Sequence, residues 1–125
     1  MPAEFIHLHV HSEYSLIDST IRVGDLVEAS VRAGMPAVAL TDQTNLFALV
    51  KFYRAAEAAG IKPIAGCDLW VGHREDRAQP QRLTVLCQNR EGYLNLSRLL
   101  SRAYAEGRHG EIAIVDIDWL DQANA

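Results

Sequence analysis

Two histidines separated by one residue are the strongest chemical signal in the sequence. His9 and His11 stand in the run HLHVHSEYSLID, which covers residues 7–18. Residues two apart on a strand point the same way and lie about 6–7 Å apart, so both imidazoles could bind one metal ion or two neighbouring ions. Imidazole suits zinc and similar ions. The spacing alone leaves open the alternative of hydrogen-bonded, structural histidines, and His7 is interpreted in that way.

Carboxylates follow the histidines at three places. Asp18 lies in the next loop and could add an oxygen ligand. Asp42 ends an apolar segment, where it either binds metal or caps the next helix; capping is the commoner role and is the prediction here. Asp68 is either a ligand or a polar residue at a strand rim. His73 and His109 lie among charged residues and are expected to be solvated.

Apolar periodicity predicts the elements that position these residues. Strands are expected over residues 5–10, 37–40, 62–71, 82–87 and 112–115, with a charged loop over 72–81. Helices are expected to end at Gly34, Gly60 and Gly107. Thr44 or Asn45 could cap the second helix and Asn89 the third. The apolar stripe of the second helix comprises Leu46, Leu49, Val50, Tyr53 and Ala56.

This order of strands and helices predicts an α/β fold with mostly parallel strands. The wholly apolar run 37–40 is typical of a strand buried on both faces. The chain has 125 residues, well short of the roughly 250 that are typical of a complete α/β barrel. We therefore expect a fragment of something longer, with a small complete α/β domain as the alternative.

Composition excludes several classes of protein. The chain is 49% hydrophobic and 22% charged, as expected for one soluble domain. It has neither an apolar run of about 20 residues nor a signal peptide, and a cytoplasmic location is expected. Its net charge of −4 predicts no general attraction to nucleic acid or acidic membranes. Cys67 and Cys87 form no C-x-x-C pair and are interpreted as reduced thiols. Phosphate-binding loops and nucleophile elbows are absent from the sequence.

Three longer stretches carry a resemblance to a known family. They are HLHVHSEYSLID (7–18), GMPAVALTDQTNLFALVKFYRAAEAAGIKPIAGCDLWV (34–71) and LTVLCQNREGYLNLSRLLSRAYAEG (83–107). They closely resemble the PHP (polymerase and histidinol phosphatase) family, in the branch that opens the large replicative DNA polymerase chains of bacteria. The resemblance implies that residues 1–125 are the N-terminal portion of a PHP domain and the first part of a distorted (β/α)7 barrel, incomplete in this chain. Intact members hold up to three metal ions at the C-terminal rim of that barrel.

The resemblance also implies a damaged metal site. His9, His11 and Asp18 match ligands of the family. Gln43 stands where intact members have the histidine of a T-D-H motif, and an amide cannot replace imidazole as a nitrogen donor. Asp68 replaces a glutamate that is one methylene longer.

Two further positions differ from the family pattern. Arg82 falls where a histidine usually precedes the L-T-x-L strand, and a permanent cation there opposes metal binding. Gly110 falls near another usual histidine, with His109 beside it. The expected site is thus vestigial, with no catalytic residue of the polymerase present in this segment.

By resemblance, the expected function is that of a non-catalytic scaffold in a DNA polymerase. Its partners would be the remainder of the polymerase chain and the separate proofreading exonuclease subunit, with DNA and dNTPs bound only by the parent enzyme, which uses magnesium. The segment itself is expected to bind no metal strongly, apart from residual zinc or manganese. The alternative is a metal-dependent phosphoesterase, either a 3′–5′ exonuclease or a small-molecule phosphatase. Uncovered strand faces of a partial barrel predict that the chain alone dimerises or aggregates.

Overall fold

One long strand, β2, organises the sheet. In the computed structural model, which describes residues 5–15, 20–73 and 76–122, the strands are β1 (Ala37–Gln43), β2 (Lys62–His73), β3 (Asp76–Leu86), β4 (Arg108–His109) and β5 (Ile112–Asp116). β1 and β5 run parallel to β2, whereas β3 is antiparallel to β2 and β4 to β5. Residues 66–68 of β2 pair with β1 and β3, and residues 70–71 pair with β5 and β3. β1 and β5 therefore follow one another along the same edge of β2.

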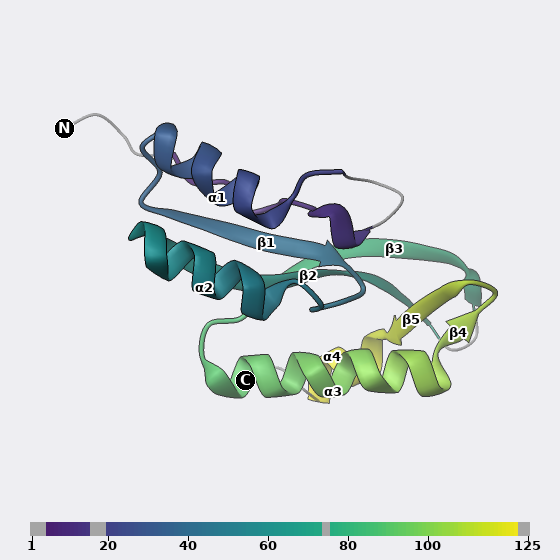
Figure 1. The fold of residues 1–125 in the computed structure, drawn as a ribbon. Coiled ribbons are helices and arrows are strands. Elements are labelled where there is room, and N and C mark those ends of the chain that lie inside the picture. The colour runs from purple at the N-terminus through teal and green to yellow at the C-terminus, as the bar shows by residue number, and fades with distance from the viewer. Residues whose placement is uncertain (1–4, 16–19, 74–75, 123–125) are drawn as a thin grey trace.

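Helices cover the sheet in two groups. The helices are α1 (Val23–Arg32), α2 (Leu49–Ala59), α3 (Arg90–Glu106) and α4 (Ile117–Gln122), with a short 3-10 helix, η1 (Glu13–Ser15). Figure 1 shows α1 and α2 beside β1, and α3 on the other side of the molecule next to β5. One apolar core joins α1, β1 and α2 around Phe52, and a second joins β2, α3, β5 and α4 around Leu69.

The sequence predictions of an α/β fold and of a strand buried on both faces are confirmed. Residues 37–42 are all buried. Asn89 caps α3 as expected, since its side chain accepts a hydrogen bond from the Gly92 amide at 2.8 Å. In the described part of the chain, every helix is too short or too polar to cross a membrane.

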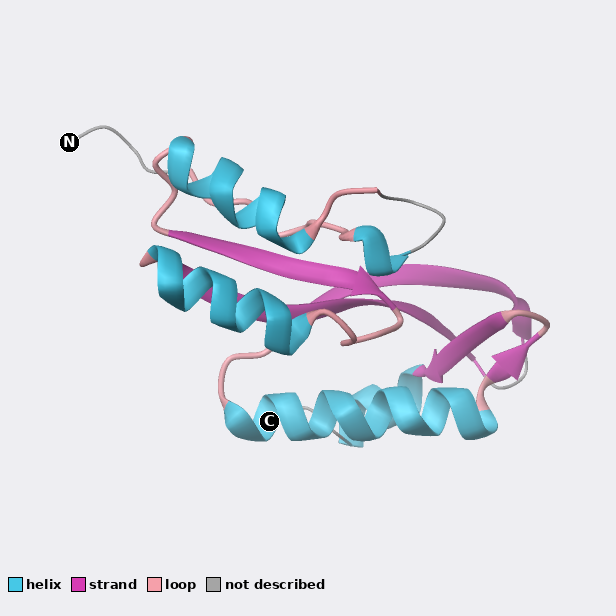
Figure 2. Ribbon diagram, viewed as in Figure 1, coloured by secondary structure: helices cyan, strands magenta, loops and turns pink. Residues whose placement is uncertain are grey.

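The strand predicted over residues 5–10 is wrong, because this segment is an extended loop beside β1 (Figure 2). The carbonyl oxygens of His7 and Val10 accept hydrogen bonds from the amides of Ala39 and Thr41, at 2.9 and 2.8 Å. These acceptors are three residues apart and the donors two, so the two segments fall out of register. The hydroxyl of Thr41 accepts the Val10 amide at 3.0 Å, which replaces a regular ladder bond.

The charged loop predicted over residues 72–81 is also wrong. β2 continues to His73 and β3 begins at Asp76, so this stretch extends an antiparallel hairpin. A charged composition does not by itself exclude a strand, because one face of an antiparallel sheet can be solvated.

The start and the buried face of α2 differ from prediction too. Its N-cap is Ala48, which has no side-chain cap bond. Asn45 instead lies before the helix, where its Oδ1 accepts the Phe47 amide at 3.2 Å. Phe52 and Ala56 are the buried residues of the helix, whereas Val50 and Tyr53 are exposed. Apolar residues occur on more than one side of this helix, so periodicity alone does not select the face that is buried.

Candidate metal centre

The candidate site lies where the extended loop passes the C-terminal end of β1. There, Gln43 of β1 is paired with Asp68 in the middle of β2. Parallel strands present their carboxyl ends at one edge of a sheet, which is where α/β folds bind ligands. The loop brings His9 and His11 from a segment 57–59 residues away to the Asp68 carboxylate.

Asp68 is the centre of a three-residue cluster. Its Oδ2 lies 2.6 Å from Nε2 of His9 and 2.5 Å from Nε2 of His11. The two imidazole rings meet edge to face with centroids 5.4 Å apart. The other carboxylate oxygen, Oδ1, accepts a hydrogen bond from the Thr84 hydroxyl of β3 at 2.5 Å. The side chain of Asp68 is fully buried, and those of His11 and His9 are 12% and 54% exposed.

The electrostatic state of Asp68 follows from these contacts. Burial alone would raise its pKa, because a carboxylate loses hydration inside the protein. The hydrogen bonds from Thr84, His9 and His11 oppose burial and hold the pKa of Asp68 below its ordinary value. Asp68 is therefore a carboxylate at neutral pH and attracts cations.

A second buried carboxylate, Asp42, fixes the segment that carries the histidines. Its oxygens accept the Ser12 amide at 2.6 Å, the Ser12 hydroxyl at 2.7 Å and the Ser15 hydroxyl at 2.7 Å. The prediction that Asp42 caps the next helix is thus wrong, since the carboxylate turns toward the loop and not toward α2. Nothing in the sequence indicated that Ser12 and Ser15 would donate hydrogen bonds to Asp42, apart from their position shortly after His11.

The turn after β1 is held by groups from two other elements. Thr44 has a φ of 55°, in the left-handed region, which is uncommon for a side chain branched at Cβ. Its amide donates to the Asp68 carbonyl at 2.8 Å, and its carbonyl accepts the Tyr104 hydroxyl of α3 at 2.7 Å. Burial raises the pKa of Tyr104, which keeps its hydroxyl a donor. Tyr104 thus links α3 to the turn after β1.

Of the three other predicted site positions, one contacts the main chain of Asp68, one lies farther along β3 and one lies outside the described residues. The Gln43 amide Nε2 donates to the Asp68 carbonyl at 3.2 Å and to the Thr44 hydroxyl at 3.1 Å. Among described residues nothing hydrogen-bonds its buried Oε1. The Arg82 guanidinium lies 4.9 Å from the centre of the Trp70 ring, and Arg82 pairs with Trp70 two register positions away from the Asp68–Thr84 pair. Asp18 lies outside the described residues.

The solvated positions predicted for His73 and His109 are confirmed, whereas the ring of His7 lies at the surface and not in the buried, structural position expected for it. His73 and His109 are exposed. His7 is exposed as well, and its ring packs edge to face on Phe5 with centroids 4.7 Å apart. Its main chain, not its side chain, connects the segment to β1.

The chemistry of the cluster fits a metal ion. His9, His11 and Asp68 each offer one ligand atom, and these atoms all lie within 4.8 Å of one another. Two imidazole nitrogens and one carboxylate oxygen are the donors found in zinc sites and suit manganese as well. In the described structure the same atoms also satisfy one another by hydrogen bonding, so an ion would have to replace those bonds.

Comparison with known proteins places the chain in a wider context. A family model described as PHP domain matches residues 7–125. DNA polymerase III subunit alpha of Pseudomonas fluorescens is 46% identical over 99% of this chain, and that of Escherichia coli K12 is 48% identical over 96%. The chain spans 11% and 10% of those two relatives.

Solved structures give the same fold. A Bifidobacterium adolescentis protein, described with reservation as a metal-dependent phosphoesterase, superposes with a TM-score of 0.62 at 20% identity. The match covers 83% of this chain and 34% of that one. A Chromobacterium violaceum amidohydrolase also matches with a TM-score of 0.62 at 20% identity, over 80% of this chain and 33% of the other.

Proposed function

The chain belongs to the PHP family, and on that premise we propose that it is the N-terminal PHP segment of a DNA polymerase III alpha subunit. The identity of 44–49% to such subunits over almost the whole chain supports this assignment. The parent enzyme would extend a primer on DNA from dNTPs with magnesium, using residues outside this segment. The free cysteines Cys67 and Cys87 agree with a reducing cytoplasmic location.

The segment itself serves as a scaffold that docks the proofreading exonuclease subunit and the rest of the polymerase chain. The observation that carries this role is the internal pairing of the candidate site. Asp68 already accepts hydrogen bonds from His9, His11 and Thr84, so the cluster holds the loop against the sheet without needing an ion. Gln43 and Arg82 replace two imidazoles of intact members, which weakens the site for zinc or manganese.

Binding of the exonuclease tests the scaffold role. The full-length polymerase chain is titrated with the purified exonuclease subunit of the same organism in a calorimeter. Deletion of residues 1–125 is expected to abolish binding, whereas His9→Ala/His11→Ala leaves it within about threefold because the histidines do not form the docking surface. Unchanged binding after the deletion would refute the role.

A metal-dependent phosphoesterase is the second candidate, and the cluster of His9, His11 and Asp68 is the observation that favours it. A bound ion would polarise a phosphate and lower the pKa of a water molecule. Metal content of the full-length chain, measured by inductively coupled plasma mass spectrometry, decides between the two. The scaffold predicts the same content in wild type and in His9→Ala/His11→Ala. One or more zinc or manganese ions lost in that variant would favour the phosphoesterase.

A further inference from the structure

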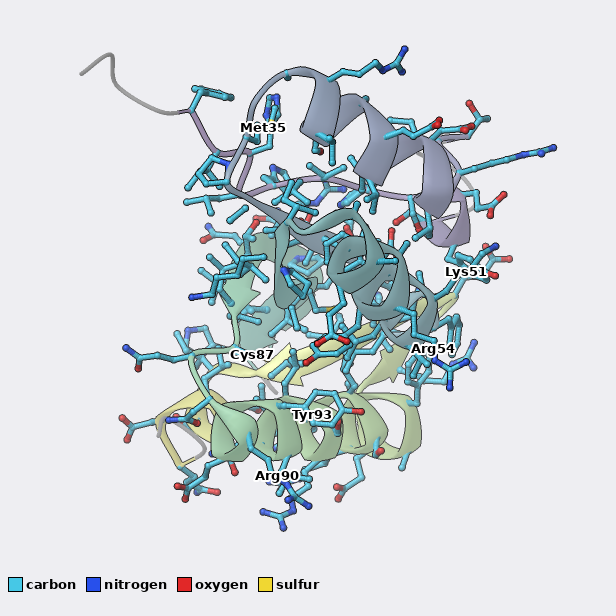
Figure 3. The ribbon with its side chains drawn as sticks, turned by 60° about the vertical axis from the view of Figure 1, so that its left-hand side comes forward. Met35, Lys51, Arg54, Cys87, Arg90 and Tyr93 are labelled. Atoms are coloured by element: carbon cyan, nitrogen blue, oxygen red, sulfur yellow. The ribbon has the colours of Figure 1, made fainter. Side chains whose placement is uncertain are left out.

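An open groove lies between α2 and the first turns of α3. It lies at the start of β2, whereas Asp68 lies at the other end of the part of β2 that pairs with β1. Its volume is about 690 Å³. The start of β2 forms its floor through Pro63, Ile64 and Ala65. Figure 3 shows Arg54 on the α2 side, Tyr93 on the α3 side and Cys87 between the two elements.

The walls of this groove leave apolar side chains in contact with solvent. Val50 and Tyr53 of α2 are 64% and 50% exposed, and Tyr93 of α3 is 37% exposed. Val50 and Tyr53 belong to the apolar stripe that sequence periodicity assigns to the core. The helix α2 therefore carries more apolar surface than its contacts with the core bury. Exposed tyrosines over aliphatic surface are typical of protein interfaces.

The charges of the groove are all of one sign. Arg54 and Lys62 are its charged lining residues, although the chain as a whole has 16 acidic and 12 basic residues. Within the described part of the chain, neither cation forms an ion pair. An occupant that supplies carboxylates would therefore gain two unpaired partners at the rim.

We infer that this groove is the docking site for an acidic peptide segment with apolar side chains. The apolar side chains would cover Val50, Ile64 and Tyr93, and the carboxylates would face Arg54 and Lys62. A nucleic acid fits less well, because the floor is aliphatic and the net charge of the chain is −4. This inference rests on the proposed function, and it assigns the segment to the proofreading exonuclease.

Charge reversal in the full-length polymerase tests the groove. Arg54→Glu/Lys62→Glu is expected to weaken binding of the exonuclease at least about tenfold, because like charges then oppose each other. Arg98→Glu is the matched control, since Arg98 is exposed on α3 outside the groove, and it should bind like wild type. Melting temperatures of the variants show that both fold. The affinity of wild type should fall with added salt more steeply than that of the double variant.

Alkylation of Cys87 gives a second measurement that needs no variant. Cys87 lines the groove and is half-buried, and digestion by trypsin releases it in the peptide of residues 83–90. The exonuclease should slow its alkylation at least about threefold, and single-stranded DNA should not.

Four results would overturn the inference. If the exonuclease binds wild type and the double variant equally, the groove is not the docking site, while the scaffold role stands. If the exonuclease binds neither, the proposed function fails and the groove assignment fails with it. Slowing of Cys87 alkylation by DNA would make the groove a nucleic-acid site. Complete protection of Cys87 in the polymerase alone would mean that another part of that chain covers it.

Discussion

Asp42 is the residue on which the geometry of the histidine loop depends. It is 2% exposed and accepts three hydrogen bonds from Ser12 and Ser15. Within the described residues, the loop carbonyls that accept main-chain hydrogen bonds from β1 are those of His7 and Val10. Asp42 therefore supplies a large share of the contacts that place His9 and His11 over Asp68.

Replacing Asp42 by alanine should cost about 3 kcal/mol of unfolding free energy, because buried donors of Ser12 and Ser15 lose their acceptor. Urea denaturation measures the loss. Glu28→Ala is the control, since Glu28 is exposed on α1 and its change should stay within about 0.5 kcal/mol. Equal losses in the two variants would show that Asp42 holds nothing in place.

Cys67 should make stability fall at alkaline pH. Burial raises the pKa of its thiol from 9.0 to about 12, against the lowering effect of hydrogen bonds to the backbone of Asn45 and Thr44. A group with a raised pKa in the folded state stabilises that state below its unfolded pKa, and the contribution is lost as pH rises from about 9 to about 12. The slope should approach about 1.4 kcal/mol per pH unit.

Urea denaturation between pH 8 and 10.5 tests the effect of Cys67. Other groups also titrate there, so the comparison is between wild type and Cys67→Ala. The variant should lose less free energy of unfolding over this range than wild type does. Parallel curves would contradict the prediction.

At the scale of elements, the end of α3 is packed so tightly against β5 that only glycine fits. A Cβ atom on Gly107 would lie 1.9 Å from the carbonyl oxygen of Ile114 and 3.0 Å from that of Ala103. The Gly107 amide also donates to the Ala103 carbonyl, and its carbonyl accepts the Ile114 amide. Backbone atoms at both contacts leave no flexible group that could move aside.

Gly107→Ala should therefore lower the unfolding free energy by more than about 3 kcal/mol. Gly24→Ala is its matched opposite, because a Cβ on Gly24 in α1 meets nothing within 4 Å. Alanine favours helix over glycine by about 1 kcal/mol, so this variant should melt at a higher temperature than wild type. Similar melting temperatures for the two variants would contradict the packing argument.

At the scale of the whole molecule, the isolated chain exposes a second apolar surface. Leu83, Leu86 and Ile117 are 44%, 42% and 44% exposed. They line a groove of about 580 Å³ between β3, α3 and α4. Surfaces of this kind on a soluble protein are usually covered by a partner.

The 125-residue chain produced alone should therefore self-associate. Multi-angle light scattering is expected to give a mass of at least a dimer, and Leu86→Lys should reduce it toward that of a monomer. Leu94→Lys is the control, since Leu94 is comparably exposed on α3 but does not line this groove. A monomeric wild-type chain with one sharp melting transition would contradict the prediction.

Local patterns in the sequence determined much of this protein. The apolar run of β1, the helical periodicity of α1 and α3 and the cap at Asn89 each depend on neighbours within a few residues, so they were predictable. The same local signal singled out His9 and His11 as metal-ligand candidates. Long motifs then indicated the PHP family, which the comparison with its family model confirmed.

Contacts between distant segments were decided only by the tertiary structure. Asp68 binds histidines 57 and 59 residues away, Asp42 binds serines 27 and 30 residues away, and Tyr104 reaches Thr44 across 60 residues. The loop beside β1 and the exposed face of α2 have the same origin. Pairing register and helix orientation depend on which distant segments come into contact in the folded chain. Short-range periodicity contains no information about those tertiary contacts.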